Sequence, residues 1–138
     1  MKLLKEIYNH LINLPPVPPE RGGIIGCKNG VGVTICEDIC SKENAFSYVP
    51  NVQYLNKEIE QWYDNNISLY AIYHTHVNNG YKLSKQDEAY IKKIVCTIPN
   101  KTDDLYFPIV IPNDKIVVYK TSRSKNQIYI IQDELILI

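Results

Sequence analysis

Apolar residues recur at helical spacing in three parts of the chain. In residues 3–14 they occupy the positions of an amphipathic helix. The run PPVPP at 15–19 ends this helix, because proline has no amide hydrogen to donate and disfavours helical geometry in the preceding residue. Helical spacing returns from Val52 to Trp62, and again in the segment that follows Ser84 and closes at Pro99-Asn100. The pattern therefore predicts three helices.

Between the helices lie short runs rich in β-branched and aromatic residues, which favour strands. The pattern predicts strands at 22–26, 31–36, 67–74, 105–111, 115–122 and 127–131. The first two are joined by Lys28-Asn29-Gly30, whose Asn-Gly pair supplies the positive φ of a tight hairpin. The order of elements predicts one mixed α and β sheet, with helices on both faces.

Length and charge restrict the class of protein. The 138 residues predict a single domain, 1–138, with one compact core. Lys+Arg and Asp+Glu both number 15, so the chain has no basic field for nucleic acid or anionic lipid. Lys5 and Glu6 interrupt the first apolar segment, and no apolar run approaches about 18 residues. We expect a soluble, cytoplasmic protein without nucleic-acid or membrane partners.

The four cysteines are Cys27, Cys36, Cys40 and Cys96. The chain is too long and too rich in core-forming residues to be a disulfide scaffold, so we expect reduced, small buried hydrophobes. Cys36 and Cys40 have a C-x-x-x-C spacing, but structural zinc usually draws on two such pairs. A cysteine metal site is the weaker interpretation.

The stretch HTHVNNGYKLSKQD, residues 74–87, contains the clearest candidate chemistry. In an extended 70–76 segment, alternation places Tyr70, Ile72, His74 and His76 on one face. Two imidazoles on one face can converge on a cation, and catalytic zinc takes three protein ligands with water in the fourth position. Asp87, at the start of the third helix, is the candidate third ligand, since the amide dipoles there favour an anion.

Each part of this pattern also has an ordinary interpretation. Ser84 and Asp87 match the Ser-x-x-acid arrangement of a helix cap. A His-x-His at the end of a strand is often incidental, and Glu20, which follows a proline pair, could be a solvated loop acid. No single part distinguishes a zinc site from a strand, a loop and a cap.

Taken together, Glu20-x-Gly-Gly-Ile-Ile-Gly26, His74-x-His76 and, seven residues later, Ser84-x-x-Asp87 match one known pattern. The chain resembles the JAB/MPN superfamily with its JAMM zinc-metalloprotease motif, most closely the compact prokaryotic branch. The resemblance covers nearly the whole chain, including the Phe46-Ser-Tyr-Val-Pro50 approach to the second helix. It implies an α/β fold of the cytidine-deaminase-like, three-layer kind, with a central mixed sheet flanked by helices.

The resemblance also implies roles for the five residues. His74, His76 and Asp87 would bind one zinc per chain, with water as the fourth ligand. Glu20 would be the general base, and Ser84 would donate a hydrogen bond to the oxyanion. Ser84 is not expected to be a nucleophile, because His10 lies in the first helix and no other histidine is free to activate it.

The implied function is zinc-dependent hydrolysis of a peptide or isopeptide bond at the C-terminal tail of a ubiquitin-like or sulfur-carrier protein. Two alternatives stay open: release of cysteine or another small amine from a sulfur-carrier C-terminus, and a non-catalytic partner-binding domain of the MPN type. A zinc nucleoside deaminase is excluded, because the chain lacks His-x-Glu and Pro-Cys-x-x-Cys.

The chain departs from the family pattern in two places. Val77 follows the second histidine where family members often have proline, so the loop from Val77 to Leu83 is less constrained. Only residues 37–50 are available for the insertion with which dedicated ubiquitin-chain-cleaving relatives grip their substrate. Ubiquitin-chain specificity is therefore not expected.

Overall fold

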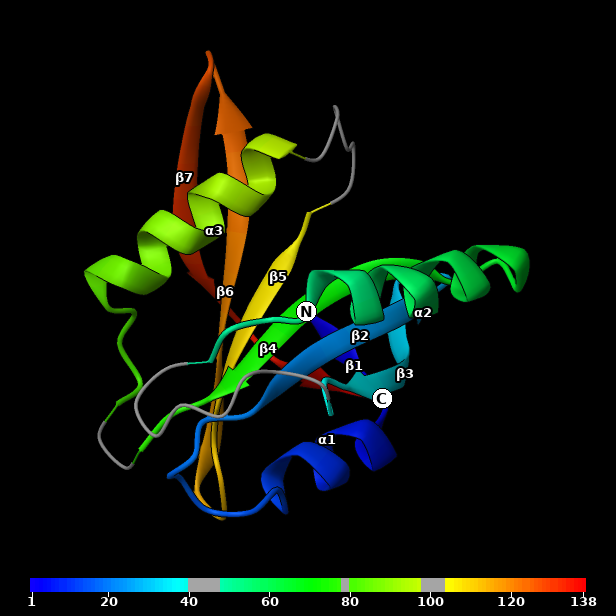
Figure 1. Cartoon of the computed structure of the whole chain (residues 1–138), viewed down its shortest axis with the longest axis vertical. Coiled ribbons are helices and arrows are strands. Elements are labelled where there is room, and N and C mark those ends of the chain that lie inside the picture. The colour runs from blue at the N-terminus through cyan, green and yellow to red at the C-terminus, as the bar shows by residue number, and fades with distance from the viewer. Residues whose placement is uncertain (40–47, 78–79, 98–103) are drawn as a thin grey trace.

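A computed structural model describes residues 1–39, 48–77, 80–97 and 104–138. Within these residues, three helices accompany eight strands that belong to one mixed sheet (Figure 1). The helices are α1 (Lys5–Ile12), α2 (Val52–Asp64) and α3 (Lys85–Thr97). The strands are β1 (Lys2–Leu3), β2 (Gly22–Lys28), β3 (Val31–Glu37), β4 (Ser68–Thr75), β5 (Tyr106–Ile111), β6 (Lys115–Ser124), β7 (Gln127–Asp133) and β8 (Ile136–Leu137).

The strand order is β7-β6-β5-β4-β2-β3-β1-β8. Strand β4 pairs antiparallel with β2 and parallel with β5, so the sheet is mixed at its centre. Strands β7 and β8 are separated by only two residues in the chain but lie at opposite ends of this order. The sheet must therefore curl so that its two ends approach each other.

The six predicted strands and three predicted helices are confirmed, with ends shifted by a few residues. The β2–β3 turn has the expected positive φ, 53° at Asn29 and 76° at Gly30. Strands β1 and β8 were not predicted, and the first helix begins at Lys5 instead of residue 3. Leu3 belongs to β1 because it pairs with Gly32 and Leu137, and local periodicity does not report such tertiary pairing. The predicted end of α3 at Pro99-Asn100 lies outside the described residues.

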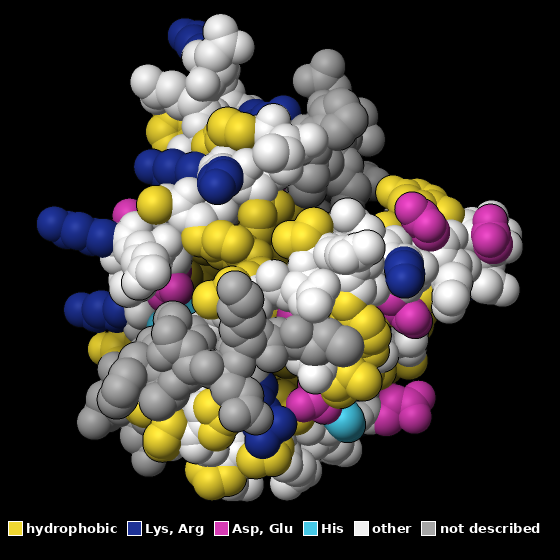
Figure 2. All heavy atoms as spheres, in the orientation of Figure 1, with side chains coloured by type: hydrophobic (Ala, Val, Ile, Leu, Met, Phe, Trp, Pro, Cys, Tyr) yellow, Lys and Arg dark blue, Asp and Glu magenta, His cyan; other side chains and the backbone are white. Residues whose placement is uncertain are grey.

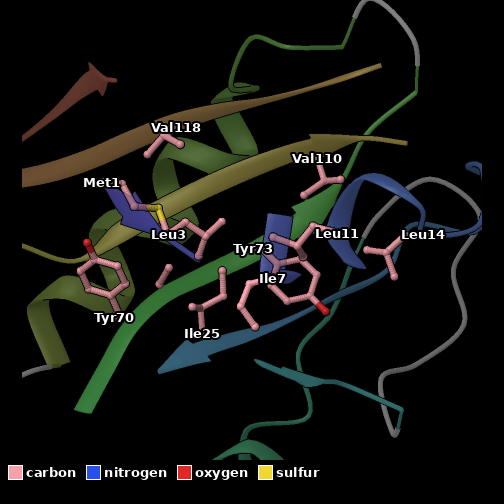
Figure 3. Close-up of a cluster of buried hydrophobic side chains, with 11 residues drawn as sticks. Met1, Leu3, Ile7, Leu11, Leu14, Ile25, Tyr70, Tyr73, Val110 and Val118 are labelled. Carbon is pink, nitrogen blue, oxygen red and sulfur yellow. The ribbon is translucent and has the colours of Figure 1, made fainter. Parts of the chain in front are cut away.

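Helices pack on both faces of the sheet, so the expected single core is divided by the sheet. Leu11 of α1 packs with Ile25 and Tyr73 on one face (Figure 3). On the other face, Ile72 packs beside residues of both α2 and α3. Ile72 and Tyr73, which are adjacent in β4, thus pack on opposite faces of the sheet, as the alternation of side chains along a strand requires.

The predicted orientation of the Tyr70 side chain on β4 is wrong. Alternation placed it on the face of Ile72 and the histidines, but it packs on the opposite face with Tyr73 (Figure 3). The cause is an irregularity in the pairing with β2: Ile25 lies opposite Ala71, and the next residue, Gly26, lies opposite Leu69. Tyr70 is the extra residue of this β-bulge, which reverses the alternation below Ala71.

The described cysteines are free, and Cys27 and Cys36 are half-buried. Cys96 is exposed on α3, so the expectation of a buried residue is wrong there. It lies near the end of the helix, where it lines an open pocket with residues from the turn between β6 and β7. Cys40 lies outside the described residues. Among the described helices, none has the length and apolarity needed to cross a membrane.

Replacing Gly23 with alanine is expected to destabilise the fold by about 1–3 kcal/mol, because the new methyl group has no space. A Cβ at Gly23 would clash with the Cys36 carbonyl oxygen and would lie 2.8 Å from the Tyr73 ring. At the comparison site, Gly32, the nearest atom is a terminal methyl of Leu3, which can shift further than a backbone carbonyl in a strand. Urea denaturation should rank Gly23→Ala below Gly32→Ala in stability; the reverse order would contradict this packing.

Candidate metal centre

The two histidines lie at the end of β4, where its pairing with neighbouring strands holds them in place. His74 pairs with Gly22 of β2 and with Ile109 of β5, and the His76 backbone N–H donates to the Val110 carbonyl at 2.9 Å. Their side chains share a face, as predicted, and their Nε2 atoms are 2.7 Å apart. The extended backbone at the end of β4 therefore places the two imidazoles on one face, close to each other.

A backbone carbonyl orients the second imidazole. His76 Nδ1 is 2.5 Å from the Gly80 carbonyl oxygen, which can only accept, so Nδ1 carries hydrogen and donates. Nε2 of neutral His76 is then an acceptor facing His74 Nε2. Metal-ligating histidines commonly use one ring nitrogen in this way to direct the other toward the ion.

Asp87 completes the group from the first turn of α3. Its Oδ1 lies 3.5 Å from His74 Nε2, and its Oδ2 lies 3.4 Å from His76 Nε2. Ligands bound tetrahedrally at about 2.0–2.1 Å are about 3.3 Å apart, so these N–O separations suit one small cation. Among the described residues, these three form the one group of His, Cys, Asp or Glu that could hold a metal ion.

Ser84 and Asp87 also form the predicted helix cap. The Asp87 backbone N–H donates to Ser84 Oγ at 3.0 Å, and the Ser84 backbone N–H donates to Asp87 Oδ2 at 3.0 Å. This reciprocal pair is a capping box. The cap and the metal group are therefore not alternatives, because the cap itself holds the Asp87 carboxylate toward the imidazoles.

Replacing Ser84 with alanine is expected to destabilise the protein by about 0.5–2 kcal/mol, since the Asp87 N–H loses its partner. Ser84→Thr keeps an acceptor oxygen and should retain most of the stability, and Lys85→Ala, at an exposed neighbour, serves as control. Urea denaturation measures all three. Equal stability of Ser84→Ala and the parent protein would mean that the cap contributes nothing.

Glu20 joins the same cavity from a distant part of the chain. The cavity has a volume of about 360 Å³, and its lining includes Glu20 together with His74, His76, Ser84 and Asp87. Thr75, which is buried between the two histidines, holds the segment of Glu20 and Arg21 beside β4 through two hydrogen bonds. Thr75 Oγ1 accepts from the Arg21 backbone N–H at 2.8 Å, and the Thr75 N–H donates to the Arg21 carbonyl at 2.8 Å. The five residues selected from the sequence therefore share one cavity.

The remaining wall of the cavity is mainly apolar. Tyr48, Val49 and Pro50 approach from the segment before α2, and Tyr90 approaches from α3. Figure 2 shows hydrophobic side chains in the hollow between α2 and α3 on this face of the molecule. Tyr48, Val49 and Pro50 belong to the 46–50 segment that is included in the resemblance, but no wall residue was assigned a site role from the sequence. Only the tertiary fold brings these residues to the histidines.

The electrostatics of the cavity favour a cation. Burial raises the pKa of the Asp87 carboxyl, but hydrogen bonds from His74 and His76 outweigh burial and lower it overall. His76 Nε2 donates its bond when the ring is protonated. Burial lowers the pKa of His76, but Asp87 and the Gly80 carbonyl outweigh burial and raise it. Both shifts reflect the stability of positive charge between these groups, which a proton or a metal ion can supply.

Glu20 behaves differently from Asp87. Burial raises the pKa of its carboxyl, and the nearby histidines lower it by less, so the net pKa is above the usual value. A carboxylate with a raised pKa is a better proton acceptor near neutral pH. The cavity thus lowers the pKa of the Asp87 carboxyl and raises that of the Glu20 carboxyl.

Comparison with known proteins adds information on the fold. No protein-family model and no curated protein matches the chain. Protein DSY2949 from Desulfitobacterium hafniense has a similar solved structure, with a TM-score of 0.66, 14% identity, and coverage of 99% of this chain and 92% of that chain. A protein from Salinibacter ruber has a TM-score of 0.60, 9% identity, and coverage of 100% and 92%. At these identities the likeness shows the fold alone.

Proposed function

We propose that this protein is a zinc-dependent peptidase or isopeptidase of the JAMM type in the JAB/MPN superfamily. The observation that carries the proposal is the shared cavity of His74, His76, Asp87, Glu20 and Ser84. His74 comes from the end of β4 and His76 from the residue just beyond it, two further groups come from the start of α3, and Glu20 comes from the segment before β2. Their convergence joins the three separate parts of the sequence motif.

The proposal includes a cytidine-deaminase-like, three-layer arrangement of the fold. It is supported by the mixed sheet, by the helices on its two faces, and by the position of the histidines at the end of central strand β4. In such sheets, the ends of strands are frequent positions for binding sites.

The donor atoms suit zinc. Two imidazole nitrogens and one carboxylate are a common catalytic zinc set, and an open fourth position remains for solvent or substrate. When bound, zinc supplies Lewis-acid chemistry: it polarises a carbonyl and lowers the pKa of water to about 7. His74 and His76 would both bind through Nε2, and Asp87 through a carboxylate oxygen.

Glu20 and Ser84 supply the remaining chemistry. Glu20 would accept a proton from the attacking water at its carboxylate and pass it to the leaving amine. Ser84 Oγ accepts the Asp87 N–H in the cap, so its own hydroxyl hydrogen is available to donate to the developing oxyanion. No covalent bond between protein and substrate is required.

The proposed substrate is the C-terminal tail of a ubiquitin-like or sulfur-carrier protein. The apolar wall formed by Tyr48, Val49 and Pro50 beside the metal group gives such a tail a surface on which to pack. Release of cysteine or another small amine would use the same groups and differ only in the leaving group.

Product masses test the proposal. Zinc-loaded protein is incubated with C-terminal fusions of ubiquitin-like and sulfur-carrier proteins, with and without a chelator, and the products are weighed by mass spectrometry. We expect two products whose masses sum to that of the substrate plus one water, and none with chelator. Equal cleavage in chelator, or no cleavage of any fusion by zinc-loaded protein, would contradict the proposed function.

A further inference from the structure

Asp38, directly after β3, is a buried acid that the proposed chemistry does not use. The residue is 5% exposed, and its Oδ2 accepts two hydrogen bonds of 2.8 Å, from the Tyr48 hydroxyl and from the Asn51 backbone N–H. Its own backbone N–H donates to the Gly22 carbonyl at 2.9 Å. A buried carboxylate is costly unless it is satisfied in this way. Asp38 thus joins the end of β3, the start of β2 and the segment before α2.

Tyr48 extends these contacts into the cavity. Its ring lies over Gly22, where an added Cβ would be 2.5 Å from two ring carbons. Its backbone amide is close enough to the Glu20 carboxylate to lower the pKa of that group slightly, and its side chain lines the cavity with Glu20. Burial and the bond to Asp38 raise the pKa of the Tyr48 hydroxyl, so this group stays a donor. Tyr48 is therefore held at its hydroxyl and its ring, and both contacts place it beside the segment that carries Glu20.

We infer that Asp38 and Tyr48 form a positioning pair that holds the Glu20 carboxylate beside His74 and His76. Asp38 touches none of the proposed reacting atoms and acts through Tyr48. Gly22 is required because only a residue without a side chain leaves room for the Tyr48 ring. The effect on turnover rests on the proposed function, whereas the positioning itself is a property of the chain.

Amide NMR tests the positioning directly. The Tyr48 amide proton should shift in Glu20→Gln, and it should shift in the same direction in Asp38→Ala. Asp64→Ala, at the exposed end of α2, serves as a matched control and should leave the resonance unmoved. Tyr48→Phe keeps the ring over Gly22 and should fold, and its residue-48 amide should shift likewise. An unmoved amide in folded Asp38→Ala or Tyr48→Phe would overturn the inference.

Kinetics separate positioning from a general loss of structure. In Asp38→Ala, kcat should fall about ten- to a hundredfold, with KM and zinc content nearly unchanged, since misplacing a catalytic group by about 1 Å has effects of that size. Asp38→Asn keeps an acceptor oxygen and should restore most of the turnover. In a Glu20→Gln background, Asp38→Ala should cause no further loss.

Equal kcat losses from Asp38→Ala with and without Glu20 would overturn the inference, because Asp38 would then act independently of the base. If the parent protein cleaves no fusion while the amide shifts appear as expected, the proposed function fails and the positioning pair stands. If the parent protein is active and the amide does not shift, the positioning pair fails and the proposed function stands.

Discussion

Glu20→Gln should lower turnover by about 10²–10⁴-fold, the usual contribution of a positioned general base. Glutamine has nearly the same shape but cannot accept a proton at the reacting water. Zinc content should stay unchanged, because Glu20 is outside the group of His74, His76 and Asp87 whose donor atoms converge. Activity and metal binding should therefore separate cleanly in this variant.

The matched control for this prediction is Glu88→Gln. Glu88 is exposed in the first turn of α3, one residue beyond Asp87, so the substitution makes the same charge change close to the site. It should leave kcat within about twofold, as for a surface change that makes no catalytic contact. If Glu20→Gln retains full turnover with zinc bound, Glu20 is not the base.

His74→Ala should abolish tight zinc binding and turnover together. The substitution removes one of two converging nitrogens, and the remaining His76 and Asp87 donors are too few for a catalytic zinc site. The parent protein should gain about 4 kcal/mol of stability when free zinc is at about 1,000 times its dissociation constant. His74→Ala should lose this gain, which thermal unfolding with and without zinc measures.

His10→Ala is the control for general effects of removing an imidazole. His10 is exposed in the last turn of α1 and is the one histidine outside the cavity. This variant should bind zinc and unfold like the parent protein in both conditions. Zinc-dependent stabilisation that survives in His74→Ala would place the metal elsewhere, for example at the cysteines.

The sequence predicted elements whose signal lies in their own residues. The helical spacing of α2 and the Asn29-Gly30 turn are local features, and both appear as predicted. Strands β1 and β8 are two residues long and exist through pairing with each other and with β3, which no local pattern records. The reversal at Tyr70 likewise depends on how β4 pairs with β2.

The same distinction applies to the site. The shared face of His74 and His76 follows from strand alternation, and the Ser84–Asp87 cap follows from spacing at a helix start. The orientation of the His76 ring depends on the Gly80 carbonyl, which alternation does not indicate. Glu20 was selected only through the resemblance to a known motif, because nothing local distinguishes it from a loop acid. The supporting contacts of Asp38 with Tyr48 and of Thr75 with Arg21 could not be predicted, since no local spacing or periodicity indicates either pairing.

Anomalous diffraction at the zinc edge, from crystals of the zinc-loaded protein, tests the central claim most directly. We predict one strong peak per chain, bonded to His74 Nε2, His76 Nε2 and an Asp87 carboxylate oxygen at about 2.0–2.2 Å. The Glu20 carboxylate should line the same cavity without bonding the metal. A peak on the cysteines, or no peak among these three side chains in zinc-loaded crystals, would contradict the account.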